Sequence, residues 1–125
     1  MAEKMNPVGW FEIPVNDLDR ARKFYESVFG IKLKIEEMGP MKMAWFPMQN
    51  DTYGSAGSLV KADGYTPSHD GTVVYLSVED IEGTLVKISA NKGKTLLPKM
   101  GIGEYGFIAQ FEDSEGNRVA LHSMK

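Results

Sequence analysis

Two kinds of hydrophobic spacing follow one another along the chain. The runs GWFEIPV (9–15) and TVVYLSV (72–78) are rich in β-branched and aromatic residues, which predicts strands. After each run, apolar residues recur every three or four positions, as at Leu18, Ala21 and Tyr25. This spacing predicts a helix with one apolar face that packs on a sheet.

The predicted helices start and end with matching residues. Asp17 and Asp80 precede them and can accept hydrogen bonds from free backbone N–H groups. Gly30 and Gly93 suit the left-handed position that ends a helix. A shift of 63 residues superimposes these positions and also places Leu33 on Leu96, which indicates an internal repeat.

Three more strand-like runs follow each helix, so the predicted order is βαβββ, twice. They are IKLKIEE, KMAWFPM and SAGSLVK in the first half, and KTLLPKM, YGFIAQF and RVALHSM in the second. Turn-forming residues between the halves predict a linker at 63–71, which separates module 1 (about 6–62) from module 2 (about 72–125) within one domain, 1–125. We expect an α+β fold in which two curved mixed sheets face each other around a central cavity, each with its helix outside. A ferredoxin-like sandwich is the structural alternative, but it needs fewer strands per helix.

Composition narrows the function. Charged residues make up 25% of the chain, hydrophobic residues 42%, and the net charge is −3, the balance of an ordinary globular protein. The basic residues form no stripe, which argues against nucleic-acid binding. No apolar run is long enough for a membrane span. With no cysteine and no signal-like N-terminus, we expect a cytoplasmic protein.

Three segments resemble the glyoxalase / bleomycin-resistance / extradiol dioxygenase superfamily, also called the vicinal oxygen chelate (VOC) fold, and in particular its short two-module proteins related to lactoylglutathione lyase. They are IPVNDLDRARKFYESVFG (13–30), LSVEDIEGTLVKISANKG (76–93) and FEDSEGNRVALHS (111–123). Together with the repeat, the resemblance covers almost the whole chain. Its motifs are specific for the fold and much less so for an activity.

The resemblance implies a divalent metal site at four positions on the first and last strands of each module. In this chain those positions hold Trp10, Ser58 (or Gly57 in a shifted register), Val73 and Ala120. None is a usual metal ligand. We therefore expect no metal and no other cofactor.

Glu12 lies two residues after Trp10, so strand alternation predicts that both side chains face the cavity. By the same rule His122 shares a face with Ala120, and the repeat makes Tyr75 the partner of Glu12. Glu12 is then either a general base or ligand anchor, or a partly solvated acid bonded to Tyr75 or Lys42. His122 is either its catalytic or metal-binding companion, or a half-exposed residue near the C-terminus.

Other aromatic and polar residues have a commoner structural use. Trp45, Phe46, Phe107 and Phe111 are expected in the core, whereas Trp10 could offer a stacking surface to a guest. Met41 and Met43 bound the cavity or lie on its back, as does Met48. His69 is expected at the surface, and GIGEYG (101–106) at a hairpin and mobile lip of the cavity.

These observations favour metal-independent binding of a small aromatic or partly apolar molecule. The resemblance implies a homodimer, since bleomycin-resistance-type proteins commonly work as dimers. The expected contacts are Trp10, Glu12, Ser58, Val73, Tyr75, Ala120 and His122. The alternative is a lyase, isomerase or dioxygenase that uses Glu12 and His122, with a relocated metal or none. A third interpretation is an interaction module whose cavity is filled by its own side chains.

Overall fold

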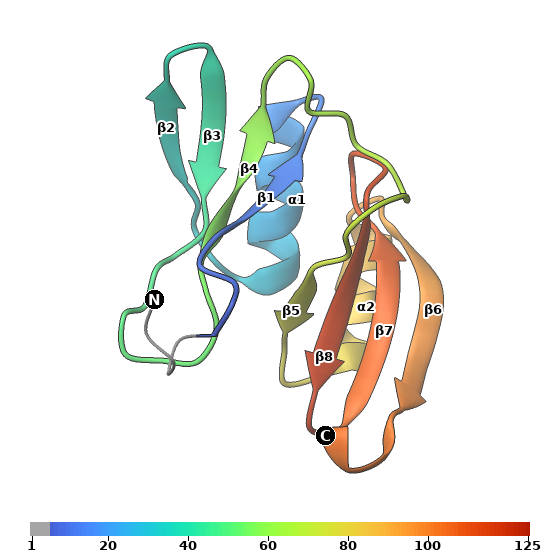
Figure 1. Cartoon of the computed structure of the whole chain (residues 1–125). Coiled ribbons are helices and arrows are strands. Elements are labelled where there is room, and N and C mark those ends of the chain that lie inside the picture. The colour runs from blue at the N-terminus through green and yellow to red at the C-terminus, as the bar shows by residue number, and fades with distance from the viewer. Residues whose placement is uncertain (1–5) are drawn as a thin grey trace.

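The predicted order of elements is confirmed in the computed structural model, which describes residues 6–125 (Figure 1). The first five residues of the predicted domain lie outside this range. Module 1 contains β1 (Phe11–Pro14), α1 (Leu18–Phe29), β2 (Lys34–Met38), β3 (Met41–Trp45) and β4 (Gly57–Lys61). Module 2 contains β5 (Tyr75–Ser77), α2 (Ile81–Ala90), β6 (Lys94–Gly101), β7 (Phe107–Glu112) and β8 (Arg118–Ser123). A short 3-10 helix, Gly103–Tyr105, lies between β6 and β7, in the predicted glycine-rich hairpin.

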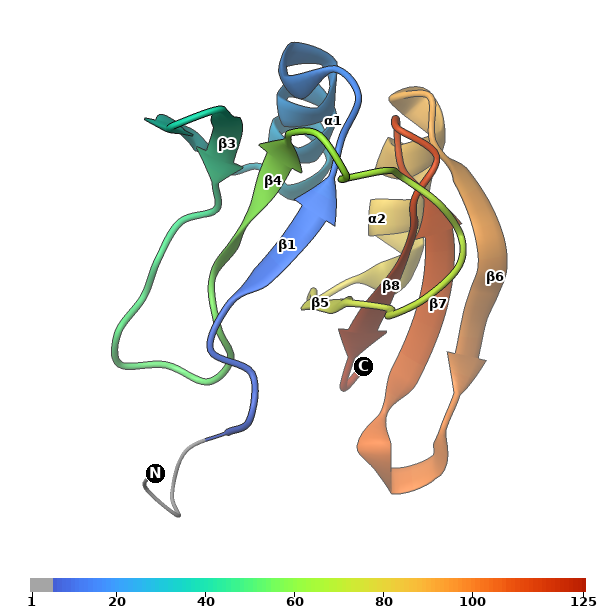
Figure 2. The same ribbon diagram turned by 45° about the horizontal axis from the view of Figure 1, so that its top comes forward.

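Each module forms one four-stranded mixed sheet, in the order β1-β4-β3-β2 and β5-β8-β7-β6. The first and last strands pair in parallel, with Glu12 opposite Ser58 in one sheet and Tyr75 opposite Ala120 in the other. The remaining neighbours pair antiparallel. The connection between β4 and β5 crosses from one sheet to the other (Figure 2). The tandem α+β architecture predicted from the repeat is therefore confirmed.

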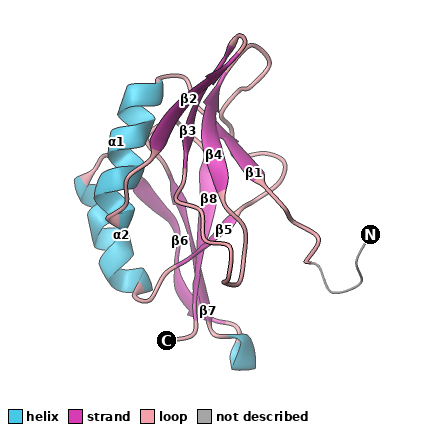
Figure 3. Ribbon diagram, turned by 90° about the vertical axis from the view of Figure 1, so that its left-hand side faces the viewer, coloured by secondary structure: helices cyan, strands magenta, loops and turns pink. Residues whose placement is uncertain are grey.

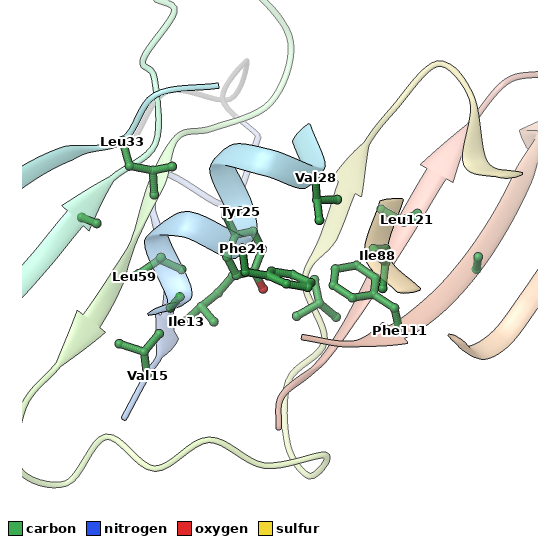
Figure 4. Close-up of a cluster of buried hydrophobic side chains, with 14 of the residues drawn as sticks. Ile13, Val15, Phe24, Tyr25, Val28, Leu33, Leu59, Ile88, Phe111 and Leu121 are labelled. Atoms are coloured by element: carbon green, nitrogen blue, oxygen red, sulfur yellow. The ribbon is translucent and has the colours of Figure 1, made fainter. Parts of the chain in front are cut away.

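One core joins the two modules. It contains Tyr25 and Val28 of α1, Ile88 of α2, Leu59 of β4 and Phe111 of β7 (Figure 4). The two helices pack on each other and lie on the same side of the strands (Figure 3). Each sheet therefore has one face without a helix, called its open face below. The two open faces lie next to each other on the side of the molecule away from the helices, rather than face to face as the sequence suggested. Helix-on-helix packing buries the apolar stripes of α1 and α2 together.

Helix starts are as predicted, and one helix end is not. Asp17 accepts a hydrogen bond from the backbone N–H of Arg20, and Asp80 does the same for Gly83. Gly30 ends α1 with φ of 65° in the left-handed region. In α2 this conformation belongs to Lys92, with φ of 74°, so the prediction for Gly93 is wrong. Gly93 is required for another reason: a Cβ there would collide with the carbonyl oxygen of Glu112 and the side chain of Ile88. No helix within residues 6–125 combines the length and apolar character needed to cross a bilayer.

The turn between β7 and β8 fastens the second module to the start of α1. Glu115 Oε1 accepts hydrogen bonds from the backbone N–H groups of Asn16 and Asp17, at 2.9 and 2.8 Å. Asn117 Nδ2 donates to the carbonyl oxygen of Pro14 at 2.8 Å. The motif DSEGN, by which the family resemblance was noticed, is thus a buried inter-module contact in this chain.

Candidate functional site

The open face of sheet A, the sheet of module 1, follows from strand alternation. Ile13 and Val15 point into the core. Because side chains alternate along a strand, Glu12 and Pro14 point to the opposite face. Glu12 is accordingly exposed on the open face. On β4, Leu59 is in the core and Ser58 is on the open face, directly opposite Glu12. Glu12 was expected to face a cavity enclosed by the two modules; it instead lies exposed on the open face of sheet A and lines neither of the two hollows described below.

Trp45 extends this row, because it lies opposite Ser58 on the other side. Its indole meets that of Trp10 edge to face, with ring centroids 5.4 Å apart and planes at 74°. The prediction that Trp45 belongs to the core is wrong: the neighbouring Ala44 holds the core position, and alternation turns Trp45 to the open face. Met43 lies two residues before Trp45 on β3 and therefore faces the same side of the sheet. It is buried and lies opposite Val60. Both tryptophans of the chain thus lie together on the open face of sheet A.

Two polar atoms of this row have no hydrogen-bond partner among the described residues: Oγ of Ser58 and Nε1 of Trp45, both buried. Ser58 is 0% exposed. A buried hydroxyl or indole N–H without a partner costs roughly 1–3 kcal/mol and is uncommon in folded proteins. The open face therefore holds two unpaired donors, which an acceptor from outside the chain could reach only after the covering side chains move.

Glu12 is bonded to neither of the partners considered from the sequence. The hydroxyl of Tyr65 donates to its carboxylate at 2.9 Å, and this bond raises the pKa of Tyr65 because it favours the protonated hydroxyl beside a negative charge. Tyr65 belongs to the connection between the modules, a segment predicted only as a linker. Tyr75 and Lys42 were the expected partners, and alternation alone could not identify a residue that reaches the sheet from a loop.

On sheet B, the sheet of module 2, Tyr75 is half-exposed and lies opposite Ala120, whereas His122 lies opposite Ser77. The neighbours of Ala120 along the strand, Val119 and Leu121, are in the core, so Ala120 and His122 share the open face as predicted. Val73 precedes β5 and is partly buried. Four of the seven predicted contact residues therefore belong to module 2 and three to module 1.

The predicted pair of Glu12 and His122 does not form a hydrogen bond within the described chain. Nε2 of His122 is 2.6 Å from the carbonyl oxygen of Tyr105. A carbonyl can only accept, so Nε2 carries the proton and Nδ1 is left as the acceptor of a neutral ring. His69, expected at the surface, is partly exposed and pairs with Glu112 at 2.8 Å.

The residues at the four inherited metal positions do not fit a metal ion. An indole, a methyl group and an isopropyl group supply no ligand atom, and the Ser58 hydroxyl is a poor one. Among residues 6–125, no group of three or more His, Cys, Asp or Glu side chains is placed to hold a metal.

Two hollows lie outside the row of Glu12, Ser58 and Trp45. One, of about 480 Å³, lies at the end of sheet A between the start of β3 and the end of β4. The other is a groove of about 780 Å³ between the modules, with Phe11, Phe29 and Phe46 on one side and Asp80 on the other. None of the seven predicted contact residues lines either hollow.

The groove corresponds through the 63-residue repeat to the place where the turn Asp113–Asn117 is seated. The turn contacts three residues of module 1: Pro14, Asn16 and Asp17. The repeat equivalents of these three residues line the groove, and they are Ser77, Glu79 and Asp80. In module 1 the equivalent connection, between β3 and β4, is longer and exposed, with Tyr53 86% exposed. The two halves of the repeat are therefore equivalent in fold but not at their junctions.

Comparisons with known proteins agree with this architecture. A family model for the glyoxalase/bleomycin resistance protein/dioxygenase superfamily matches residues 8–121. A glyoxylase-like domain-containing protein of Didymella fabae is 31% identical over 118 residues, which cover 91% of each chain.

Two solved structures show the same fold. A glyoxalase I mutant from Zea mays has a TM-score of 0.69 at 21% identity over 94% of this chain, which spans about half the length of the maize protein (46%). TnmS3, an antibiotic binding protein from Streptomyces sp. CB03234, has a TM-score of 0.67 at 19% identity, over 98% of both chains. With the family model matched along most of its length, this chain belongs to the glyoxalase/bleomycin resistance protein/dioxygenase superfamily.

Proposed function

We propose that this protein binds a small aromatic or partly apolar molecule, without a resident metal, on the open face of sheet A. The observation that carries the proposal is the cluster of Trp10, Trp45 and Ser58 beside Glu12. Two indole rings offer apolar area and stacking faces, while two buried donors and one exposed carboxylate offer polar contacts. Apolar walls with a few placed polar groups are the usual composition of small-molecule sites.

The polar groups indicate the character of the ligand. Nε1 of Trp45 donates only, and Oγ of Ser58 can donate, so they suit a carbonyl or ether oxygen. The carboxylate of Glu12, which holds only the Tyr65 hydroxyl, suits a donor such as a hydroxyl or ammonium group. A ligand with an aromatic body, one acceptor and one donor would satisfy all three residues.

A second copy of the chain would complete the site. The open faces lie side by side within one chain, so a ligand on sheet A is covered only on one side. In a homodimer, sheet B of the partner, with Tyr75 and His122 on its open face, could cover sheet A. Val73 and Ala120 would then be apolar contacts. The lack of cysteine suits the reducing cytoplasm, where we place the protein.

Relatives support the class of function. TnmS3, which has the same fold over nearly its whole length, is described as an antibiotic binding protein. We propose the same class, binding without chemistry, for this chain. The identity of 19% transfers the fold and no particular ligand.

The test is a thermal-shift screen of a library of small aromatic compounds with wild-type protein, followed by titration of any hit by calorimetry. We expect hits whose affinity falls roughly tenfold in Trp10→Ala and in Glu12→Gln. Lys32→Met, an exposed substitution away from the open face, is the matched control. Hits whose affinity is unchanged in both variants would refute the site, and the absence of any hit would refute the function.

A catalytic role is the second candidate, because Nδ1 of His122 is left free as an acceptor on the open face of sheet B. Together with Glu12 of a partner copy it could act as base or hold a metal in a lyase, isomerase or dioxygenase. Stoichiometric divalent metal in protein purified without chelators, lost in His122→Ala and in Glu12→Gln, would favour this candidate.

A further inference from the structure

The hollow at the end of sheet A contains an unusual juxtaposition of charge. Lys42 on β3 and Lys61 on β4 lie directly opposite each other in the antiparallel ladder, and both line this hollow. Opposite residues of an antiparallel pair have side chains on the same face, about 5 Å apart at Cβ. Like charges in this position destabilise a sheet, so this pair needs a physical explanation.

Neither lysine is neutralised by the described chain. Among residues 6–125, no carboxylate lies within 4 Å of either ammonium group. Lys61 donates to the carbonyl oxygen of Asn16 at 2.8 Å, a bond that fixes its position without cancelling its charge. Glu37, opposite Lys42 on the other side, forms no ion pair with it.

The hollow has the size and walls of a small-ligand site. Its volume is about 480 Å³, within the usual range for such sites. Pro40, Met41 and Ala62 supply apolar surface. Asp63 is the one acidic residue among its lining residues, so the two lysines leave an excess of one positive charge.

We propose that this hollow, the lysine pocket, binds the oxyanion group of a small molecule between Lys42 and Lys61, with the rest of the molecule against Pro40 and Met41. An oxyanion between two ammonium groups would turn their repulsion into two charge-assisted hydrogen bonds. Lysine binds phosphate and carboxylate as a point charge, and both groups fit this arrangement. The inference does not rest on the proposed function, because none of the seven contacts proposed there lines the pocket.

The test uses inorganic phosphate and acetate as separate probes. Each is titrated into 15N-labelled protein at constant ionic strength while the amide signals of Asn16, Lys42 and Ala62 are followed. Saturable shifts of these signals are expected, and the probe that binds more tightly identifies phosphate or carboxylate as the natural group. No saturable shift with either probe would overturn the proposal.

Matched variants distinguish specific binding of an anion in the lysine pocket from non-specific attraction of anions to the positive charges of the protein. Lys42→Met and Lys61→Met keep most of the aliphatic stem and should each weaken binding roughly fivefold. The double variant should abolish saturation, whereas Asp63→Asn should strengthen binding by removing the opposing charge. Lys32→Met should bind like wild type.

Undiminished binding in the double variant, or an equal loss in Lys32→Met, would overturn the proposal. Folding of the double variant is checked by the dispersion of its amide spectrum. It should be retained, because the substitutions remove a repulsive pair.

Discussion

Glu115 and Arg20 are 95 residues apart in sequence and joined by two hydrogen bonds, of 2.6 and 3.0 Å. The Glu115 side chain is fully buried, whereas that of Arg20 is 53% exposed. Burial opposes ionisation of Glu115, but the bonds from Arg20 and from the backbone of Asp17 and Asn16 outweigh it and lower its pKa. The pair fastens module 2 to the start of α1.

Glu115→Gln should therefore lower the free energy of unfolding by about 2 kcal/mol, since a hydrogen bond to a charged group is worth more than a neutral one. The value is reduced by the exposure of Arg20. Chemical denaturation measures the change. Glu37→Gln, at an exposed position, is the control and should change stability by less than about 0.5 kcal/mol.

The same pair should give a pH signature. A carboxyl whose pKa is lowered by folding stabilises the protein above its ordinary pKa, and this contribution is lost as the pH falls through the lowered value. The difference in stability between wild type and Glu115→Gln should thus be constant near neutral pH and shrink below roughly pH 4.3. A difference that stays the same down to pH 3 would contradict the lowered pKa.

Tyr25 and Asp113 give a second pH signature, at a carboxyl whose pKa is raised rather than lowered. Burial raises the pKa of Asp113, while hydrogen bonds to its carboxylate, including one of 2.7 Å from the Tyr25 hydroxyl, oppose the rise. Tyr25→Phe removes that bond and should cost about 1–3 kcal/mol at neutral pH. The hydrogen bond favours the ionised carboxylate, so this cost should be smaller below roughly pH 3.9, where Asp113 is protonated in both the folded and the unfolded state.

Unfolding of Tyr25→Phe and wild type at pH 3 and pH 7 tests this. Tyr53→Phe, at an exposed tyrosine, should match wild type at both values. An equal loss for Tyr25→Phe at the two pH values would show that the hydroxyl acts independently of the Asp113 charge.

The fold was predictable from local signals because each one has a local cause. Asp17 and Asp80 cap their helices with their own side chains, and Gly30 adopts a backbone conformation that its sequence position suggested. The error at Gly93 has a long-range cause, since a strand of the same sheet, β7, approaches it at Glu112. Such an approach leaves no periodic trace in the sequence.

The site was predictable only in part. Strand alternation predicted that Glu12 and the buried Ile13 point to opposite faces, because period two is a property of the strand itself, but it did not predict that the face of Glu12 is open to solvent. It could not give Tyr65 as the partner, since that residue arrives from a loop, nor the placement of both helices on one side of the strands. The motif DSEGN was noticed as a signature, but its role as an inter-module contact depends on residues about 100 positions away.

Gly57 should tolerate no side chain. A Cβ there would collide with the backbone oxygen and the ring of Phe11 on the neighbouring strand. Gly57→Ala should destabilise the protein by about 1–3 kcal/mol, the usual cost of overpacking, and disturb the pairing that places Glu12 opposite Ser58. Gly9→Ala, where a Cβ meets open space, is the control for thermal unfolding, and similar melting temperatures for the two variants would contradict this account.

Glu12→Gln should leave stability within about 0.5 kcal/mol of wild type, because the side chain is exposed and its bond to Tyr65 is solvated. Tyr65→Phe should behave alike. Binding of an aromatic ligand with a donor group should nevertheless fall in Glu12→Gln, which separates a binding role from a structural one. A loss of stability above about 2 kcal/mol would instead make Glu12 a structural residue.

The most direct test follows from the chain having two tryptophans, both on the open face of sheet A. Their two indole N–H signals in a 1H–15N spectrum, assigned with Trp10→Phe and Trp45→Phe, report on the proposed site alone. Titration with the aromatic compound that raises the melting temperature most should shift both signals saturably, and the Trp45 signal downfield as its buried N–H gains an acceptor. A compound that stabilises the protein while both indole signals stay unchanged would place binding elsewhere and contradict the account.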